Sequence, residues 1–364
     1  MSANHGSSII PKLGSSKYPS ALRKETYLAM ETAKNVSKIK IILAFIGIYV
    51  IWGSTYLAIK FAIDTMPPFM MASFRFLVAG LGFLAVLMML GHERPKKQHW
   101  LSAFVLGTLL LAASNGSVVM ATKTISTGFI SLLIAMVPVY VAILEWLENR
   151  KQKFEKKKIA GLLLGTMGIV TLIGPQNLLV PGQINWGGIA LVMFGSLSWS
   201  VGTIYSRKAD KPSSLMVGIA MQMICGGAVL GLVSLLMGEH TQVAHMQFSM
   251  RSILSVLYLI VFGSIVGYSS YLWLLNHVSA SKVSTYAYVN PIVAIFLGWA
   301  FAGETIGMQT ILSGAIILAS VWLITGSKKQ QEPAVVPCRV VETSGGKQVC
   351  QTIELASSGS KKSA

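Results

Sequence analysis

The chain has 364 residues, of which 53% are hydrophobic and only 12% carry a charged side chain. Soluble domains carry about 25% charged residues, so this composition excludes an ordinary soluble enzyme or binding domain. The formal net charge is +17. The basic residues lie in short loops and tails, where membrane orientation signals belong, which argues against nucleic acid as a partner. The three cysteines show no metal-ligand spacing, so neither a metal nor another cofactor is expected.

Both ends of the chain are polar and differ from the apolar part between them. Residues 1–37 contain no apolar run of the kind that a signal peptide needs, so they are predicted to form an N-terminal tail. Residues 327–364 are predicted to form a C-terminal tail. Within it, the segment from Cys338 to Leu355 alternates around a Ser-Gly-Gly turn in the manner of a β-hairpin.

Between the tails the sequence is a series of apolar runs, each about as long as a membrane is thick. A hydrocarbon core about 30 Å thick needs roughly 20 apolar residues per helix. The pattern therefore predicts an all-α polytopic membrane protein with about ten transmembrane helices. In chain order we expect them at 40–62, 69–90, 99–121, 126–147, 158–174, 186–206, 213–237, 252–275, 281–302 and 308–326.

Positive charge alternates along the predicted loops. Lysine and arginine gather in the loops after the second, fourth, sixth and eighth helices, whereas the intervening loops offer only Lys123 and Arg251. Cytoplasmic loops of membrane proteins carry this excess of positive charge. We therefore expect both tails to lie in the cytoplasm and the uncharged turn at 175–185 to lie outside.

The two halves of the apolar region repeat one another. At one constant offset Trp52 matches Trp199, and Arg75 matches Gln222. Several such matches indicate an internal duplication, with repeats at 38–174 and 185–326. Each repeat holds five predicted helices, an odd number, so the second repeat must enter the membrane from the opposite side. Inverted repeats are typical of alternating-access transporters, which bind their solute near the midplane.

Four short segments resemble the EamA family of the drug/metabolite transporter superfamily: Ile51–Tyr56, Phe74–Leu77, Ser284–Pro291 and Gly303–Glu304. The resemblance spans about 40–326 and is strongest to bacterial inner-membrane exporters of metabolites and amino acids. It implies two EamA-like repeats, a bacterial inner membrane as the location, and export as the direction of transport.

Arg75 is the clearest candidate for a solute contact, because charges inside a membrane are costly and usually face a cavity or a partner. One interpretation is a cation that binds the carboxylate of a solute. The other is an arginine whose long side chain reaches the outer lipid headgroups. Gln222, its counterpart in the second repeat, is neutral and is placed on the same solute pathway.

Two prolines and two amides extend this predicted pathway. Pro138 and Pro291 are expected in the middle of helices, where each frees a backbone carbonyl. In equivalent positions they fit a broken helix at a central site, or alternatively a passive kink. Asn115 and Asn290 are buried amides that need hydrogen-bond partners, either in the cavity or between helices.

Aromatic side chains are candidates for a pocket that holds an apolar or aromatic solute, although some must belong to interfacial belts. Trp52 and Tyr56 share one helix face, as do Trp199 and Thr203. The aromatic residues assigned to the solute pathway are Trp52, Tyr56, Trp199, Tyr271 and Tyr286.

Two acidic residues are candidates for coupling or gating. Glu145 lies near the inner end of the fourth helix, where it is either a proton site or the partner of a neighbouring basic residue such as Lys151. Glu304 is predicted in an outer loop, and the family resemblance implies a structural or gating role. Lys60, at the outer end of the first helix, is predicted to be an interfacial anchor.

These features predict a secondary transporter that moves a small solute without covalent chemistry. An intramembrane enzyme would need a motif such as H-E-x-x-H or G-x-S-x-G, and neither appears. A membrane scaffold or receptor is a further alternative, against which the duplicated helices argue. The expected partners are a small-molecule solute and the lipid bilayer. Coupling to protons, export or import, and a monomer or homodimer remain open.

Overall fold

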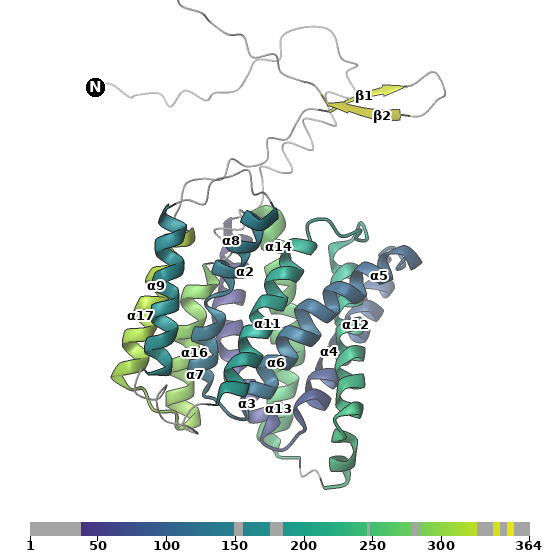
Figure 1. The fold of residues 1–364 in the computed structure, drawn as a ribbon. Coiled ribbons are helices and arrows are strands. Elements are labelled where there is room, and N and C mark those ends of the chain that lie inside the picture. Colours follow the sequence, from purple (N-terminus) through teal and green to yellow (C-terminus); the bar gives the residue numbers. More distant parts are fainter. Residues whose placement is uncertain are drawn as a thin grey trace, which may run out of the picture.

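The computed structural model describes residues 38–148, 156–174, 185–245, 248–278, 283, 285–325, 338–342 and 348–352. The predicted N-terminal tail and the predicted outer turn at 175–184 lie outside these residues. Within them, the apolar part of the chain is helical throughout (Figure 1).

The first half of the apolar region contains α-helices and two π-helical turns. In chain order these are α2 (Lys38–Ile46), η1 (Gly47–Ile51), α3 (Trp52–Ile63), α4 (Pro68–Met89), α5 (Lys97–Leu106), η2 (Gly107–Ala113), α6 (Ser114–Ala121), α7 (Thr127–Ile134), α8 (Val137–Glu148) and α9 (Lys156–Ile173).

The second half has the same character and adds a short 3-10 helix. In chain order it contains α11 (Trp186–Tyr205), α12 (Leu215–Leu236), η3 (Glu239–His245), α13 (Met250–Tyr258), η4 (Leu259–Tyr268), α14 (Ser269–His277), α16 (Tyr286–Ala302) and α17 (Met308–Thr325). Near the C-terminus β1 (Cys338–Glu342) pairs antiparallel with β2 (Gln348–Thr352), which confirms the predicted hairpin.

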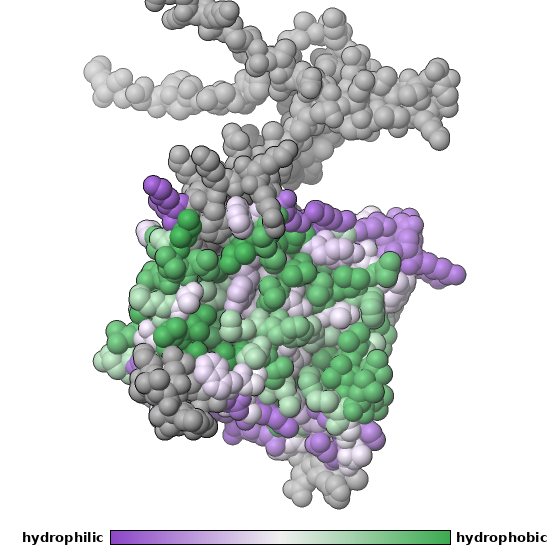
Figure 2. All heavy atoms as spheres, viewed as in Figure 1, coloured by the Kyte–Doolittle hydropathy of each residue, from purple (hydrophilic) through white to green (hydrophobic). Residues whose placement is uncertain are grey.

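Seven helical runs of the described chain are long and apolar enough to cross a membrane: Lys38–Ile63, Pro68–Met89, Lys97–Ala121, Thr127–Glu148, Trp186–Tyr205, Leu215–Leu236 and Met250–Leu275. Three shorter apolar helices are Ile159–Ile173, Tyr286–Ala302 and Met308–Leu323. The chain is therefore a multi-pass helical membrane protein. Figure 2 shows the matching surface, a hydrophobic band with hydrophilic residues at both of its margins.

The prolines differ from one another in a way that the sequence did not predict. The run 127–148 is interrupted at Ala135 and Met136, so Pro138 is the second residue of α8 and not a mid-helix proline. A proline in a first turn costs little, because its missing N–H would have no helical partner there. Pro291 does lie inside α16, where it removes one helical hydrogen bond.

Small residues allow the helices to pack closely. The helix pairs in most extensive contact are α4 with α12 and α9 with α17. Gly107 and Gly226 face one another, and a Cβ added to Gly226 would lie 2.7 Å from the carbonyl oxygen of Gly107. Glycine is therefore required at this crossing, as expected of small residues at membrane helix contacts.

Ion pairs mark the two ends of the bundle. Lys60, in the last turn of α3, contacts Glu304, which precedes α17. At the other end Arg207, which follows α11, contacts Glu145 near the end of α8. We call these the Glu304 end and the Glu145 end. Because α3 ends and α17 begins at the Glu304 end, α2 begins and α17 ends at the Glu145 end, at the top of Figure 1.

Candidate functional site

A cavity of about 90 Å³ lies inside the bundle, between helices from both halves of the chain. Its wall combines aromatic, aliphatic and hydroxyl side chains with a single cation. The lining residues are Trp52, Thr55, Tyr56, Ile59, Arg75, Phe76, Leu111, Ser114, Asn115, Val118, Ile134, Val137, Ser196, Trp199, Gly263, Ser264, Tyr268, Tyr286 and Asn290. We call this space the central cavity.

Four aromatic rings form a connected cluster at the central cavity. Trp52 contacts the rings of Trp199, Tyr271 and Tyr286, with centroid distances of 5.7, 5.2 and 5.6 Å. Trp199 and Tyr271 also contact each other at 5.6 Å. Tilted and edge-to-face rings at these distances attract one another, so the cluster forms a firm wall. The indole nitrogen of Trp52 donates to the carbonyl oxygen of Gly263 at 3.2 Å.

Arg75 brings an isolated positive charge to this wall. It is only 3% exposed, which rules out the interpretation that its side chain reaches the lipid headgroups. Its Nε donates to the hydroxyl of Ser264 at 2.8 Å, and its Cζ lies 4.7 Å from the ring centroid of Phe76. Among the described residues, no acidic side chain forms an ion pair with it. A buried cation without a counterion is costly unless a ligand supplies one.

Hydrogen-bond donors without partners also gather here. In the described part of the chain, Arg75 Nη1 and Ser196 Oγ are buried and have no partner, and both residues line the central cavity. A buried polar group without a hydrogen bond costs about 1–3 kcal/mol. A ligand that carries acceptor atoms would recover this cost.

Two amide side chains at the cavity bind carbonyl oxygens of the π-helical turns η1 and η2. The amide nitrogen of Asn290, directed at η1, donates to the carbonyl oxygens of Ile48 and Tyr49 at 2.9 and 3.0 Å. Asn115 donates in the same way to the carbonyl oxygen of Leu110 in η2, at 3.2 Å. Both amides therefore satisfy backbone carbonyls of irregular turns while lining the cavity. Turns of this kind recur at functional sites in membrane and soluble helices.

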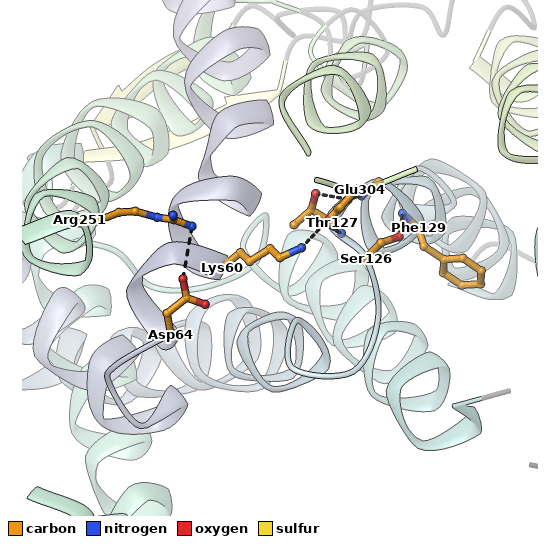
Figure 3. A network of polar contacts seen from close by, with 8 residues as sticks. Lys60, Asp64, Ser126, Thr127, Phe129, Arg251 and Glu304 are labelled. Atoms are coloured by element: carbon orange, nitrogen blue, oxygen red, sulfur yellow. Dashed lines mark hydrogen bonds and ion pairs between the residues drawn. The ribbon is translucent and has the colours of Figure 1, made fainter. Parts of the chain in front are cut away.

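Glu304 organises the Glu304 end of the bundle (Figure 3). Its carboxylate accepts hydrogen bonds from Lys60 Nζ at 2.8 Å and from the backbone N–H and the hydroxyl of Thr127 at 3.0 and 2.9 Å. Thr127 is the first residue of α7, so the carboxylate also lies at a helix N-terminus, which favours negative charge. One side chain thus joins α3, α7 and the start of the loop before α17.

The charge state of Glu304 follows from these contacts. Burial raises the pKa of its carboxyl group, but the hydrogen bonds from Lys60 and Thr127 outweigh burial, so that the pKa lies below its ordinary value. Lys60, which was predicted to be an interfacial anchor, is 30% exposed in the last turn of α3 and pairs with this carboxylate. Nearby, Arg251 and Asp64 form a longer and more exposed pair at 3.4 Å.

The Glu145 end carries a different pair of contacts. Glu145 forms an ion pair with Arg207 at 2.7 Å, and Glu148 accepts a hydrogen bond from Lys208 at 2.8 Å. These partners come from the segment after α11, which the sequence did not predict. Lys151 lies outside the described residues. The two ion pairs tie α8 to α11.

Comparison with known proteins identifies the chain. Residues 39–174 and 186–326 each match the EamA-like transporter family. The chain belongs to this family.

Several relatives are membrane transporters by name. The uncharacterized inner membrane transporter YedA of Escherichia coli is 36% identical to this chain, over 81% of it and 94% of YedA. The uncharacterized transporter YoaV of Bacillus subtilis is 23% identical, over 79% of this chain and 97% of YoaV. A crystal structure 16% identical in sequence covers 79% of this chain and 96% of its own, with a TM-score of 0.56, and thus shares the fold.

Seven of the residues predicted for the solute pathway of this EamA-like chain line the central cavity: Trp52, Tyr56, Arg75, Asn115, Trp199, Tyr286 and Asn290. Four others do not. Tyr271 lies behind the cavity in the aromatic cluster, Gln222 borders a second cavity, and Pro138 and Pro291 each follow a lining residue directly.

Sequence reasoning missed three hydroxyl groups of this EamA-like chain. Ser264 contacts Arg75, Ser196 lines the cavity, and Thr127 contacts Glu304. Serine and threonine are common in membrane helices, so their positions alone carry no signal. Only Ser264, which lies in the Gly263-xxx-Gly267 segment, belonged to a pattern that predicts close helix contact.

Proposed function

We propose that this EamA-like protein is a secondary transporter that exports small metabolites or amino acids by alternating access. The observation that carries the proposal is Arg75, a buried cation without an acidic partner in the described chain, at the wall of an internal cavity. A carboxylate bound there would receive charge-assisted hydrogen bonds from the guanidinium group. The aromatic cluster would contact the apolar part of the same solute.

The proposed solute class follows from the cavity wall. Arg75 supplies the positive charge, while the hydroxyl of Ser196 supplies a further donor. No acidic side chain of the described residues lines the cavity, so nothing in this wall favours a solute that carries only positive charge. We therefore expect anionic or zwitterionic solutes with an apolar or aromatic group, such as amino acids.

The packing of the helices supports two inverted repeats at 38–174 and 185–326. α3 packs on α16, and α11 packs on α8, so the first helix of each half contacts the fourth helix of the other half. Trp52 and Trp199, which match at the repeat offset, contact each other at the cavity. An approximate twofold relation between opposite halves fits five helices in each repeat.

The ends of α4 and α12 support the same relation. Each helix is followed by a glycine with positive φ, Gly91 at 80° and Gly238 at 74°. Glu239, which follows α12, accepts hydrogen bonds from the backbone N–H groups of Phe69 and Met70 at the start of α4. Beyond the other end, Glu93 accepts a hydrogen bond from Ser213, just before α12.

Alternating access would use the two ends as gates. At the Glu304 end the carboxylate of Glu304 joins Lys60 and Thr127, and at the Glu145 end Arg207 joins α8 to α11. Both sets of contacts are closed in this structure. Release of one set while the other stays closed would expose the cavity to one side of the membrane. We propose gating for Glu304 and Glu145 and not a proton site at Glu304, since the low pKa of Glu304 keeps it charged.

The orientation and direction belong to the same proposal. The excess of lysine and arginine at the Glu145 end supports a cytoplasmic location of that end, with both tails inside. The name of YedA supports a bacterial inner membrane as the location. Export is favoured by the family resemblance, and import is the alternative.

Counterflow in proteoliposomes tests the proposal directly. Purified protein is reconstituted with an unlabelled amino acid or metabolite inside, and uptake of the labelled compound is followed with and without a proton gradient. We expect counterflow for at least one carboxylate-bearing compound and none for the matched amine without a carboxylate. Counterflow of amines alone would contradict the proposed solute class, and no counterflow across a broad panel would contradict transport.

A further inference from the structure

A second cavity of about 460 Å³ lies toward the Glu145 end. Its wall is formed by the segment between α11 and α12 together with parts of η2, α12 and α14. The lining residues are Leu106, Leu110, Thr203, Ser206, Arg207, Lys211, Pro212, Ser213, Ser214, Leu215, Gly218, Gln222, Leu272 and Leu275. We call it the vestibule, and neither the family match nor the proposed function assigns it a role.

The vestibule is electropositive. Among the described residues, its wall includes Arg207 and Lys211 and no acidic side chain, although Glu93 accepts a hydrogen bond from the lining residue Ser213. Arg207 uses Nη2 for Glu145, which lies outside the wall, and has further N–H groups. Lys211 is an exposed residue, but partial burial of its amine removes water from the charged form and lowers its pKa. Serine, threonine and glutamine side chains complete the polar part of the wall.

The vestibule adjoins the central cavity through a thin partition. Gln222 lines the vestibule, and its Oε1 accepts a hydrogen bond from the hydroxyl of Tyr268, which lines the central cavity. On α11, Trp199 faces the central cavity and Thr203, one turn later, faces the vestibule. A solute that leaves the vestibule toward Arg75 would therefore have to pass the pair of Tyr268 and Gln222.

We propose that the vestibule is a second binding site for carboxylate-bearing solutes, where Lys211 and Arg207 hold the anionic group before it passes Tyr268 and Gln222 to reach Arg75. This inference rests on the proposed function and adds a site to it. The ligand chemistry is that of a small organic anion or zwitterion. Two cations on one wall would raise its local concentration by attraction that salt screens.

Charged thiol reagents test the electrostatics without knowledge of the solute. In a full-length protein with Cys225, Cys338 and Cys350 replaced by alanine, Thr203→Cys places one thiol in the vestibule. The measured quantity is a ratio of two modification rates of this thiol. The numerator is the rate with the anionic sulfonatoethyl methanethiosulfonate, and the denominator is the rate with the cationic trimethylammonioethyl methanethiosulfonate. This ratio is normalised to the ratio for a free thiol. We expect Lys211→Gln to lower the normalised ratio about tenfold, from the interaction of unit charges at close range.

Lys208→Gln is the matched control, because Lys208 lies in the same segment but pairs with Glu148 and does not line the vestibule. We expect it to change the ratio by less than about twofold, since the charge of Lys208 is paired with Glu148 and lies outside the wall. Equal effects of the two substitutions, or no preference for the anionic reagent in the parent protein, would overturn the vestibule site.

Transport by the same variants separates this inference from the proposed function. Lys211→Gln should raise the apparent KM for a carboxylate-bearing amino acid in counterflow several-fold with little change in maximal rate, because the central cavity is intact. An unchanged KM would contradict the vestibule site while counterflow itself still supports transport. A protein that shows the reagent preference but no counterflow of any compound would contradict the proposed function instead.

Discussion

Arg75 and Glu304 are both charged residues with little exposure, yet their surroundings differ completely. Glu304, with a side chain 10% exposed, is bound by a lysine, a backbone N–H and a hydroxyl. Arg75, only 3% exposed, has a hydroxyl on one nitrogen and no acidic partner in the described chain. A carboxylate with all its partners present stabilises a structure, whereas a buried cation without a counterion weakens it. The difference fits our proposals that Glu304 ties the end of the bundle when that gate is closed and that Arg75 binds a solute.

The largest effect on stability is expected from a substitution of Glu304. Glu304→Ala removes the partner of Lys60 and the hydrogen bonds at the start of α7, so we expect a loss of about 2–3 kcal/mol in stability. Thermal unfolding in detergent, followed by circular dichroism, measures it. A double-mutant cycle with Lys60→Ala should show coupling, since the two side chains share one contact. An unaltered melting temperature would mean that Glu304 is not a structural tie.

At Arg75 the expected stability effect has the opposite sign. Arg75→Gln removes an uncompensated charge, so the melting temperature should stay level or rise by the equivalent of about 1 kcal/mol. Transport per protein should nevertheless fall roughly 30-fold, since charge-assisted hydrogen bonds are worth about 2 kcal/mol. Arg75→Lys keeps the charge, loses the planar fork and should recover transport only in part.

Arg251→Gln is the matched control for an arginine, because its pair with Asp64 is exposed and long at 3.4 Å. We expect an effect below about 1 kcal/mol on stability and no effect on transport. Losses of transport that are equal for Arg75→Gln and Arg251→Gln would show that the charge in the cavity has no special role.

Substitutions of Asn290 and Pro291 test whether the wall of the central cavity belongs to the solute pathway. Asn290→Ala leaves two carbonyl oxygens of η1 without their side-chain donor, and Pro291→Ala restores a helical N–H inside α16. We expect both variants to reach the membrane and to transport about tenfold more slowly, because the wall of the cavity shifts without loss of the fold. Transport normalised to protein in the membrane measures this. Normal rates in both variants, or no folded protein in either, would remove α16 from the pathway.

The smallest effect concerns pH. In the folded protein the pKa of the Glu304 carboxyl group lies below its ordinary value of 4.5. The unfolded chain therefore binds the proton more tightly than the folded protein does. The stabilisation is therefore fully present above the unfolded pKa and is lost as the pH falls through the folded pKa. Melting temperatures measured down to pH 4 should begin to fall more steeply for the wild-type protein than for Glu304→Gln. Parallel curves would mean that protonation of Glu304 does not matter.

The sequence predicted the helices well, because a hydrocarbon slab imposes a length and a composition that can be read directly. It predicted less well where side chains from distant helices meet. Among the described residues Glu145 pairs with Arg207, which is distant in sequence, and Lys60 binds Glu304 from the other half of the chain. Such pairs follow from helix packing, which a single sequence does not reveal.

The candidate site shows the same division. Trp52, Trp199 and Arg75 were predicted because aromatic and charged residues are conspicuous in apolar helices. Ser264 and Tyr268 form the contacts of Arg75 and Gln222, and both lie in η4. Periodicity does not predict where a helix changes to π-helical turns, so these two contacts could not be predicted, although the Gly263-xxx-Gly267 spacing indicates close helix contact in this segment.

The most direct test of the account is the dependence of carboxylate recognition on Arg75. In proteoliposomes, each amino acid that shows counterflow and the amine that lacks only its carboxylate are compared as competitors of transport. The comparison is made for the wild-type protein, Arg75→Gln and Arg75→Lys. We predict that the wild-type protein prefers the amino acid by at least about 30-fold, that Arg75→Lys keeps part of this preference, and that Arg75→Gln has none. A preference in Arg75→Gln as strong as in the wild-type protein would contradict the account.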